Sequence, residues 1–257
     1  MPQDHDTVRN LVHDYFERRL PDQPAYPHLK PALPLAMVLV TGSFAIGMAR
    51  PGSDLDIEMI VPDELHPAML QAAGGPGGLW VHDEAHTSLV DVKVRPLNRL
   101  CRRLVGDDPE SLWIHQHVVV VQDPDAQLPA LVEQATEQFR EHVPQLVATR
   151  YRAFRNLVTV EDSREELCRQ VMLGKAIESV LTLPLLARGE PHPYPKWQSW
   201  WLVERHARGA EIVDLCHRLL AERVTRETFE PLRCIIDDIL IEVRHGDRLV
   251  RNFWRRL

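Results

Sequence analysis

The chain of 257 residues is long enough for one large domain or, more naturally, for two modest domains that share an interface. Its 44% hydrophobic and 26% charged residues are typical of a soluble globular protein. The formal net charge of -7 makes a long nucleic acid a poor candidate partner, because an acidic surface repels phosphate backbones. We see no apolar run long enough for a signal peptide or a membrane span, and the four cysteines form no C-x-x-C pair. We therefore expect a cytoplasmic protein that does not bind a membrane.

The N-terminal half carries short helical and strand patterns. Apolar residues three and four apart predict a helix over 8–20, and the proline-rich stretch 21–34 predicts an extended connection. A continuous apolar run over 35–40 predicts a strand that ends at Gly42-Ser43, with a short helix after it at 44–48. The other patterns of this half predict strands near 54–61, 79–82, 88–96 and 118–122, and helices near 67–73 and 97–105.

From about residue 128 the strand patterns end and helical periodicity continues. The predicted helices cover 128–142, 145–160, 164–187, 198–207, 210–222 and 228–244, with Pro144 between the first two. The sequence therefore predicts an α+β fold: a domain with a small mixed β-sheet at residues 1–125, followed by an all-α helical bundle at residues 126–257.

The segment from Thr41 to Glu58 carries the chemistry. A strand that ends in Gly42-Ser43 lets the backbone approach a phosphate closely, and the Ser43 hydroxyl adds a hydrogen-bond donor. Asp54 and Asp56 are separated by one apolar residue on a predicted strand, so both carboxylates lie on the same face. Two adjacent negative charges are unfavourable unless a cation lies between them, and Mg²⁺ is the hard ion that prefers oxygen ligands.

Each of these motifs is common by itself. An Asp-x-Asp pair on a strand is more often a solvated face than a metal site, and a Gly-Ser after a strand is usually a turn. The combination of a strand, Gly42-Ser43, a turn and Asp54-x-Asp56 at this spacing favours a functional site.

The segment from Val40 to Ile57 resembles the signature of the DNA polymerase β-like nucleotidyltransferase superfamily. The resemblance implies a third carboxylate on a neighbouring strand, and Asp91 fits that position. Asp54, Asp56 and Asp91 would then hold Mg²⁺. Lys93, two residues on and on the same face, would meet a phosphate or be a solvated strand lysine.

Within the superfamily, the α+β half with a helical C-terminal domain looks like the aminoglycoside and other small-molecule nucleotidyltransferases. The Pro-Tyr-Pro-Lys-Trp stretch at 193–197 also resembles a motif of an uncharacterised bacterial family with the same N-terminal signature. The antibiotic-modifying relatives imply a glutamate that activates the acceptor hydroxyl and a lysine of the helical domain that binds phosphate. Glu178 is the candidate base, and Lys175 and Lys196 are the phosphate candidates; each also fits a structural role.

The resemblance thus implies Mg²⁺-dependent transfer of a nucleoside monophosphate, AMP first among them, from ATP or another NTP. The acceptor would be a hydroxyl of a small molecule, and pyrophosphate would leave. Two other readings stay open: a protein AMPylating or RNA-end nucleotidyltransferase, and a catalytically silent module that senses nucleotides or binds a partner. No residue pattern specifies the acceptor or the oligomeric state.

Overall fold

The computed structural model describes residues 4–72, 80–83, 89–105, 108–159, 165–222, 224–242 and 250. The chain divides into two compact units, Met1–Glu137 and Gln138–Leu257. This division falls within helix α7 (Leu128–Arg155), whereas the last strand, β5 (Val119–Gln122), ends before residue 125. A mixed sheet in the first unit and helices in the second confirm the predicted α+β class.

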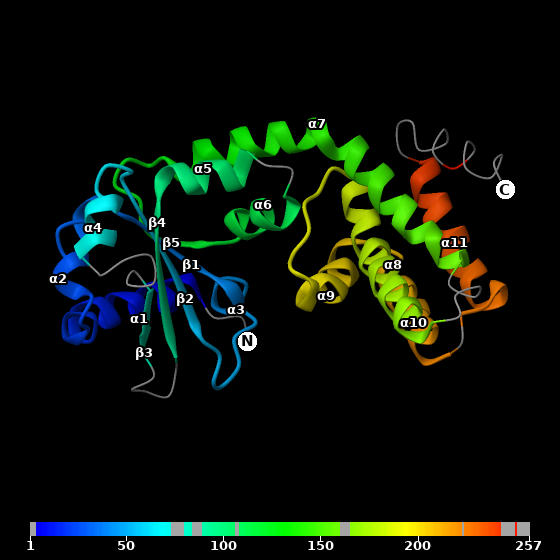
Figure 1. Ribbon diagram of the computed structural model, residues 1–257, viewed down its shortest axis with the longest axis horizontal. Helices are drawn as coiled ribbons and strands as arrows, with labels where there is room; N and C mark the ends of the chain where they lie inside the picture. Colours follow the sequence, from blue (N-terminus) through cyan, green and yellow to red (C-terminus); the bar gives the residue numbers. More distant parts are fainter. Residues whose placement is uncertain are drawn as a thin grey trace. The chain divides into compact units, whose positions relative to one another are not determined.

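The first unit is built around a five-stranded sheet in the order β3-β4-β2-β1-β5 (Figure 1). The central strands are β1 (Met37–Thr41), β2 (Leu55–Val61) and β4 (Val90–Pro96), and β3 (Trp80–Asp83) forms one edge. β2 runs parallel to β4, whereas the β1–β2, β1–β5 and β3–β4 pairs are antiparallel. The sheet is therefore mixed, as predicted.

Six α-helices are described in the first unit: α1 (His5–Arg18), α2 (Tyr26–Leu29), α3 (Gly42–Ala45), α4 (His66–Ala72), α5 (Leu97–Val105) and α6 (Pro109–Gln116). The predicted extended connection over 21–34 is wrong, because short helical turns at Leu20–Asp22, α2 and Leu33–Leu35 occupy it. Each of these turns has a proline in its first positions, where the fixed φ suits a helix and no amide hydrogen is needed.

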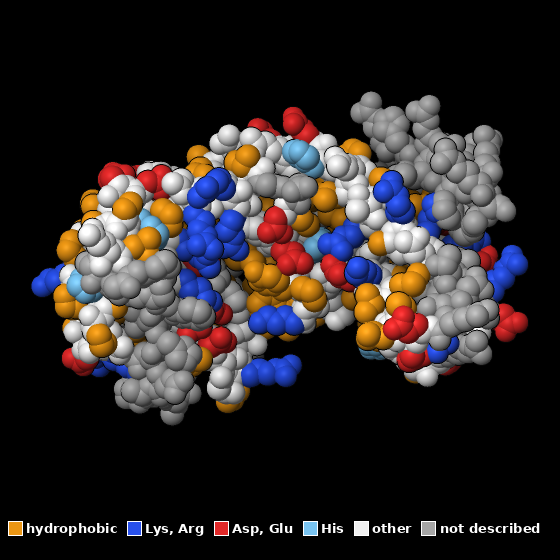
Figure 2. All heavy atoms as spheres, in the orientation of Figure 1, with side chains coloured by type: hydrophobic (Ala, Val, Ile, Leu, Met, Phe, Trp, Pro, Cys, Tyr) orange, Lys and Arg blue, Asp and Glu red, His pale blue; other side chains and the backbone are white. Residues whose placement is uncertain are grey.

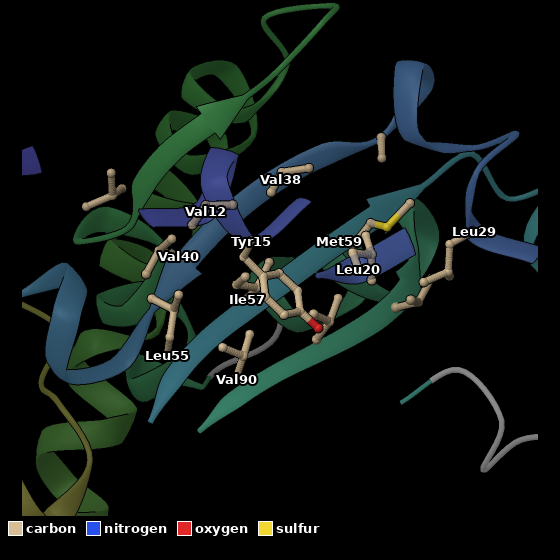
Figure 3. Close-up of a cluster of buried hydrophobic side chains, with 14 of the residues drawn as sticks. Val12, Tyr15, Leu20, Leu29, Val38, Val40, Leu55, Ile57, Met59 and Val90 are labelled. Carbon is tan, nitrogen blue, oxygen red and sulfur yellow. The ribbon is translucent and has the colours of Figure 1, made fainter. Parts of the chain in front are cut away.

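One face of the sheet, the apolar face, packs against α1 and forms the hydrophobic core of the first unit. Figure 3 shows side chains of α1, β1, β2 and β4 meeting there. The buried residues in this contact include Val12 and Tyr15 of α1, Val40 of β1, and Ile57 and Met59 of β2. Their spacing of three on the helix and two on the strands is what each element needs to turn one face inward.

The opposite face, the site face, carries alternate polar residues of β2 and β4 and also contacts helix α5. Glu58 and Ile60 of β2 point to this side and are buried, so this strand is covered on both faces. Helix α6, next to α5, was not predicted. Residues 111–115 are buried consecutively, so α6 shows no one-sided apolar pattern, although Asp108 caps it and Pro109 begins it.

The second unit holds α8 (Glu166–Ala187), α9 (Pro195–Arg205), α10 (Gly209–Ala221) and α11 (Arg226–Ile241), together with the C-terminal part of α7. The predicted break at Pro144 is wrong, because α7 continues through this residue. Pro144 is exposed, so the carbonyl that loses its helical donor there can bond to water instead. Helix α8 is long and apolar enough to cross a bilayer, but it packs against α9, α10 and α11 as a core helix does.

Candidate active site

Three carboxylates converge on the site face of the first unit. One oxygen each from Asp54, Asp56 and Asp91 lies within 4.8 Å of the others. The parallel register places Asp56 directly beside Asp91, and the Leu55 amide donates to the Leu89 carbonyl at 2.8 Å, which aligns the two strand starts. Asp54 and Asp56 are half-buried and Asp91 is 8% exposed.

This cluster fits a hard divalent cation. All three donors are carboxylate oxygens, which Mg²⁺ prefers at about 2.0–2.1 Å. Three negative charges so close together and partly removed from water repel one another, and a bound cation reverses that repulsion. Of the described residues, only these three were found as a group of three or more possible metal ligands. They could therefore hold one or two ions, as the sequence predicts.

Lys93 belongs to the same cluster. Its Nζ lies 2.7 Å from Asp56 Oδ1, and its side chain is 30% exposed. It follows Asp91 by two positions on β4, so both residues project from the site face. The ammonium group therefore compensates part of the negative charge, and the interpretation of Lys93 as a purely solvated lysine is wrong.

Gly42 is required for the close approach between the end of β1 and Asp56. Its φ is +72°, and a Cβ at this position would lie 2.7 Å from Asp56 Oδ2. Thr41 pairs with Asp56 across the β1–β2 ladder, so the turn into α3 passes directly beside the carboxylate. A side chain at residue 42 would meet an unfavourable backbone region and displace a candidate metal ligand.

We expect Gly42→Ala to weaken Mg²⁺ binding by about 10–100-fold, the usual effect of disturbing the support of a metal ligand. The matched control is Gly52→Ala, because Gly52 has a φ of +85° with nothing within 4 Å of its Cβ position. Both variants should lose about 1–2 kcal/mol of stability through the positive φ. Only Gly42→Ala should lose metal affinity, measured by calorimetric Mg²⁺ titration. Equal affinities in the two variants would contradict the role given to Gly42.

Glu58 forms a second charged cluster on the site face. Arg95 Nε and Arg103 Nη1 each lie 3.3 Å from Glu58 Oε1. On the other side, His115 Nε2 lies 3.5 Å from Glu58 Oε2, while His115 Nδ1 lies 2.7 Å from the Ser111 carbonyl. A carbonyl can only accept, so Nδ1 carries a hydrogen, and a second proton on Nε2 would complete an ion pair with Glu58.

This cluster shifts the pKa of Glu58. Burial by itself would raise that pKa, but the His115 contact and the charges of His115, Arg103 and Arg95 outweigh it and lower the pKa from 4.5 to about 2. Sequence reasoning missed the cluster, in which His115 is a buried member with 2% exposure. The available signal was the period of two that continues from Asp54 and Asp56 to Glu58.

The remaining predicted residues belong to the second unit. Glu178 lies on α8, half-buried, with its Oε1 at 2.6 Å from Arg150 Nη1. Lys175 is exposed one turn earlier on the same helix. Lys196 lies in the first turn of α9, with its Nζ 4.2 Å from the Trp197 ring centroid. Their roles as base and phosphate ligands stay predictions.

No family model matches the chain, and no curated protein matches it. Among solved structures, it is similar to a nucleotidyltransferase-like protein from Exiguobacterium sibiricum 255-15, with 13% sequence identity and a TM-score of 0.46. The match covers 94% of this chain and 80% of that one. A functional proposal for this chain therefore has to rest on its own residues.

Proposed function

We propose that this protein is a Mg²⁺-dependent nucleotidyltransferase that moves a nucleoside monophosphate from an NTP to a hydroxyl of a small-molecule acceptor. The observation that carries the proposal is the convergence of Asp54, Asp56 and Asp91 within 4.8 Å beside Gly42, whose missing side chain leaves room at Asp56. Three carboxylates beside a backbone turn suit a triphosphate with its metal ions.

Asp54, Asp56 and Asp91 would hold Mg²⁺, which neutralises charge on the phosphates and polarises the α-phosphate when it is bound. The turn at Gly42-Ser43 would receive the triphosphate, with the Ser43 hydroxyl as a donor. Lys93, now on Asp56, would move to a phosphate oxygen once metal binds the carboxylate. In this reaction Lys93 would act through its positive charge.

The chemical step would be an in-line displacement at the α-phosphorus. The acceptor oxygen gives its proton to a carboxylate, for which Asp91 is the candidate in the first unit, and forms a bond to phosphorus. The bond from phosphorus to the bridging oxygen breaks, and pyrophosphate leaves with the electron pair. Positioning and charge stabilisation would supply most of the rate, as in phosphoryl transfer generally. ATP is the first donor to test.

The test is thermal unfolding with each of the four NTPs, with and without Mg²⁺. At about 100 times its dissociation constant a ligand adds ~2.7 kcal/mol of stability. For a chain of this size we expect the midpoint to rise by roughly 5–10 °C, and only when Mg²⁺ is present. Pyrophosphate release in the presence of acceptors then tests transfer. Mg²⁺-dependent NTP binding without pyrophosphate release would favour a silent nucleotide sensor. Labelling of a protein or of RNA would show that the acceptor is not a small molecule.

A further inference from the structure

Arg95 and Arg103 are held side by side on the site face. Their guanidinium nitrogens both lie 3.3 Å from the same oxygen, Glu58 Oε1, so the two groups can be no further apart than twice that distance. The two guanidinium groups therefore place two positive charges next to each other at one carboxylate. The side chains of Arg95 and Arg103 are 20% and 27% exposed, so both reach solvent while being largely enclosed.

The surroundings strengthen this positive charge. Helix α5, which carries Arg103, also presents the exposed side chain of Arg99. Figure 2 shows Lys and Arg side chains gathered over the region of β4 and α5, in blue. The whole chain has a net charge of -7, so a cationic patch of this kind is a local feature of the site face. Charges of one sign gathered at one place attract the opposite charge.

The pair lies on a particular side of the carboxylates. Glu58 is paired with Lys93 in the β2–β4 register, two positions beyond the pair Asp56 and Asp91, which is about 7 Å along the strands. Gly42 lies on the other side, because β1 runs antiparallel to β2 and ends at Thr41 opposite Asp56. The guanidinium pair and the proposed triphosphate turn therefore flank the carboxylates from opposite ends.

We propose that Arg95 and Arg103 bind an anionic group of the acceptor, a phosphate monoester in the first place, and so orient its hydroxyl toward Asp91. This inference rests on the proposed function, because it assigns the substrate class of the same site. Guanidinium groups bind phosphate oxygens through two parallel hydrogen bonds, and two adjacent groups can hold one phosphate between them. With its phosphate at this pair, the acceptor would present its hydroxyl end to the carboxylates.

The first experiment measures transfer from a labelled NTP with Mg²⁺ to phosphorylated sugars and polyols, each paired with the same compound after phosphatase treatment. We expect the phosphorylated member of at least one pair to be labelled at least about tenfold faster. Equal labelling of both members of every accepted pair, or labelling of RNA alone, would overturn the proposal.

The second experiment compares Arg103→Gln with Arg102→Gln, a control on the same helix whose guanidinium bonds Asn98 and not Glu58. We expect Arg103→Gln to raise the KM for the phosphorylated acceptor at least about tenfold, with kcat and the KM for NTP unchanged. Arg102→Gln should change each constant less than about twofold. If Arg103→Gln does not fold, Arg103→Lys replaces it, because lysine keeps the positive charge but lacks the planar guanidinium group. Its KM for the phosphorylated acceptor should lie between the wild-type value and a tenfold increase.

A third measurement works without turnover. In metal-free buffer, inorganic phosphate should stabilise the wild type and the Arg102→Gln variant, and should bind Arg103→Gln about tenfold more weakly. Equal stabilisation of Arg103→Gln and wild type would overturn the assignment of the pair. A wild type that binds phosphate through Arg103 but shows no Mg²⁺-dependent NTP binding would instead refute the proposed function and leave the anion site standing.

Discussion

Replacing Asp54 by asparagine should make the metal-free protein more stable and abolish its response to Mg²⁺ and NTP. Without metal, the Asp54 carboxylate lies within 4.8 Å of two other carboxylates, and removing one charge should relieve about 1 kcal/mol of repulsion at this half-buried position. With metal, the variant loses one of three ligands. We expect nucleotidyl transfer to fall at least ~10³-fold, since charge neutralisation by a metal contributes several kcal/mol to the transition state.

The measurement is unfolding in chelator and in Mg²⁺ with NTP, followed by backbone hydrogen exchange in β2 and β4, which reports on the first unit. The matched control is Glu64→Gln, which removes one exposed carboxylate just after β2. The control should keep the Mg²⁺ response and change stability by no more than about 0.5 kcal/mol. An Asp54→Asn variant with wild-type activity would refute the proposed metal site. An Asp54→Asn variant that is less stable than the wild type in chelator would show that the three carboxylates do not repel one another.

Replacing Glu58 by glutamine should destabilise the first unit by about 3 kcal/mol at pH 7. The carboxylate is 6% exposed and its pKa is lowered from 4.5 to about 2, and each pKa unit corresponds to about 1.4 kcal/mol. The glutamine side chain removes the negative charge that Arg95 and Arg103 both contact. Breaking a buried ion pair by removing one partner commonly has an effect of this size.

The pH dependence gives this prediction a distinct signature. Because the folded-state pKa of Glu58 is below its unfolded value, the stabilisation is fully present above about pH 4.5 and is lost as the pH falls toward 2. The free energies of unfolding of wild type and Glu58→Gln should therefore differ at pH 7 and converge near pH 2, as measured by denaturant titration with hydrogen exchange in β2. A difference that stays constant between these pH values would show that Glu58 contributes through packing and not through its charge.

Local patterns were enough to predict part of this site. Asp54 and Asp56 share a face because a strand alternates its side chains, and this follows from two positions in the chain. Gly42 was expected to allow a close backbone approach, and the structure shows Asp56 as the group that it approaches. These features depend on neighbouring residues and on backbone stereochemistry, which the sequence carries directly.

Other features needed contacts between distant segments. Pairing of β2 with β4 in parallel register brings Asp91 beside Asp56, and a shift of one residue would have turned Asp91 to the apolar face. From the sequence, Lys93 could have been a solvated lysine. In the structure its Nζ lies 2.7 Å from Asp56 Oδ1. The superfamily resemblance suggested that Asp91 joins Asp54 and Asp56, but only the hydrogen bonding of the sheet brings it beside Asp56.

By itself, then, the sequence determined the α+β class, most of the elements, and the two aspartates on one strand face, because periodicity and turn residues act over short distances. Only the tertiary structure decided that α7 continues through Pro144 and that the Glu58 carboxylate contacts Arg95, Arg103 and His115. The physical reason is the same in both cases. Exposure of a proline and burial of a charge depend on which surfaces the folded chain covers, and local residue patterns do not specify that.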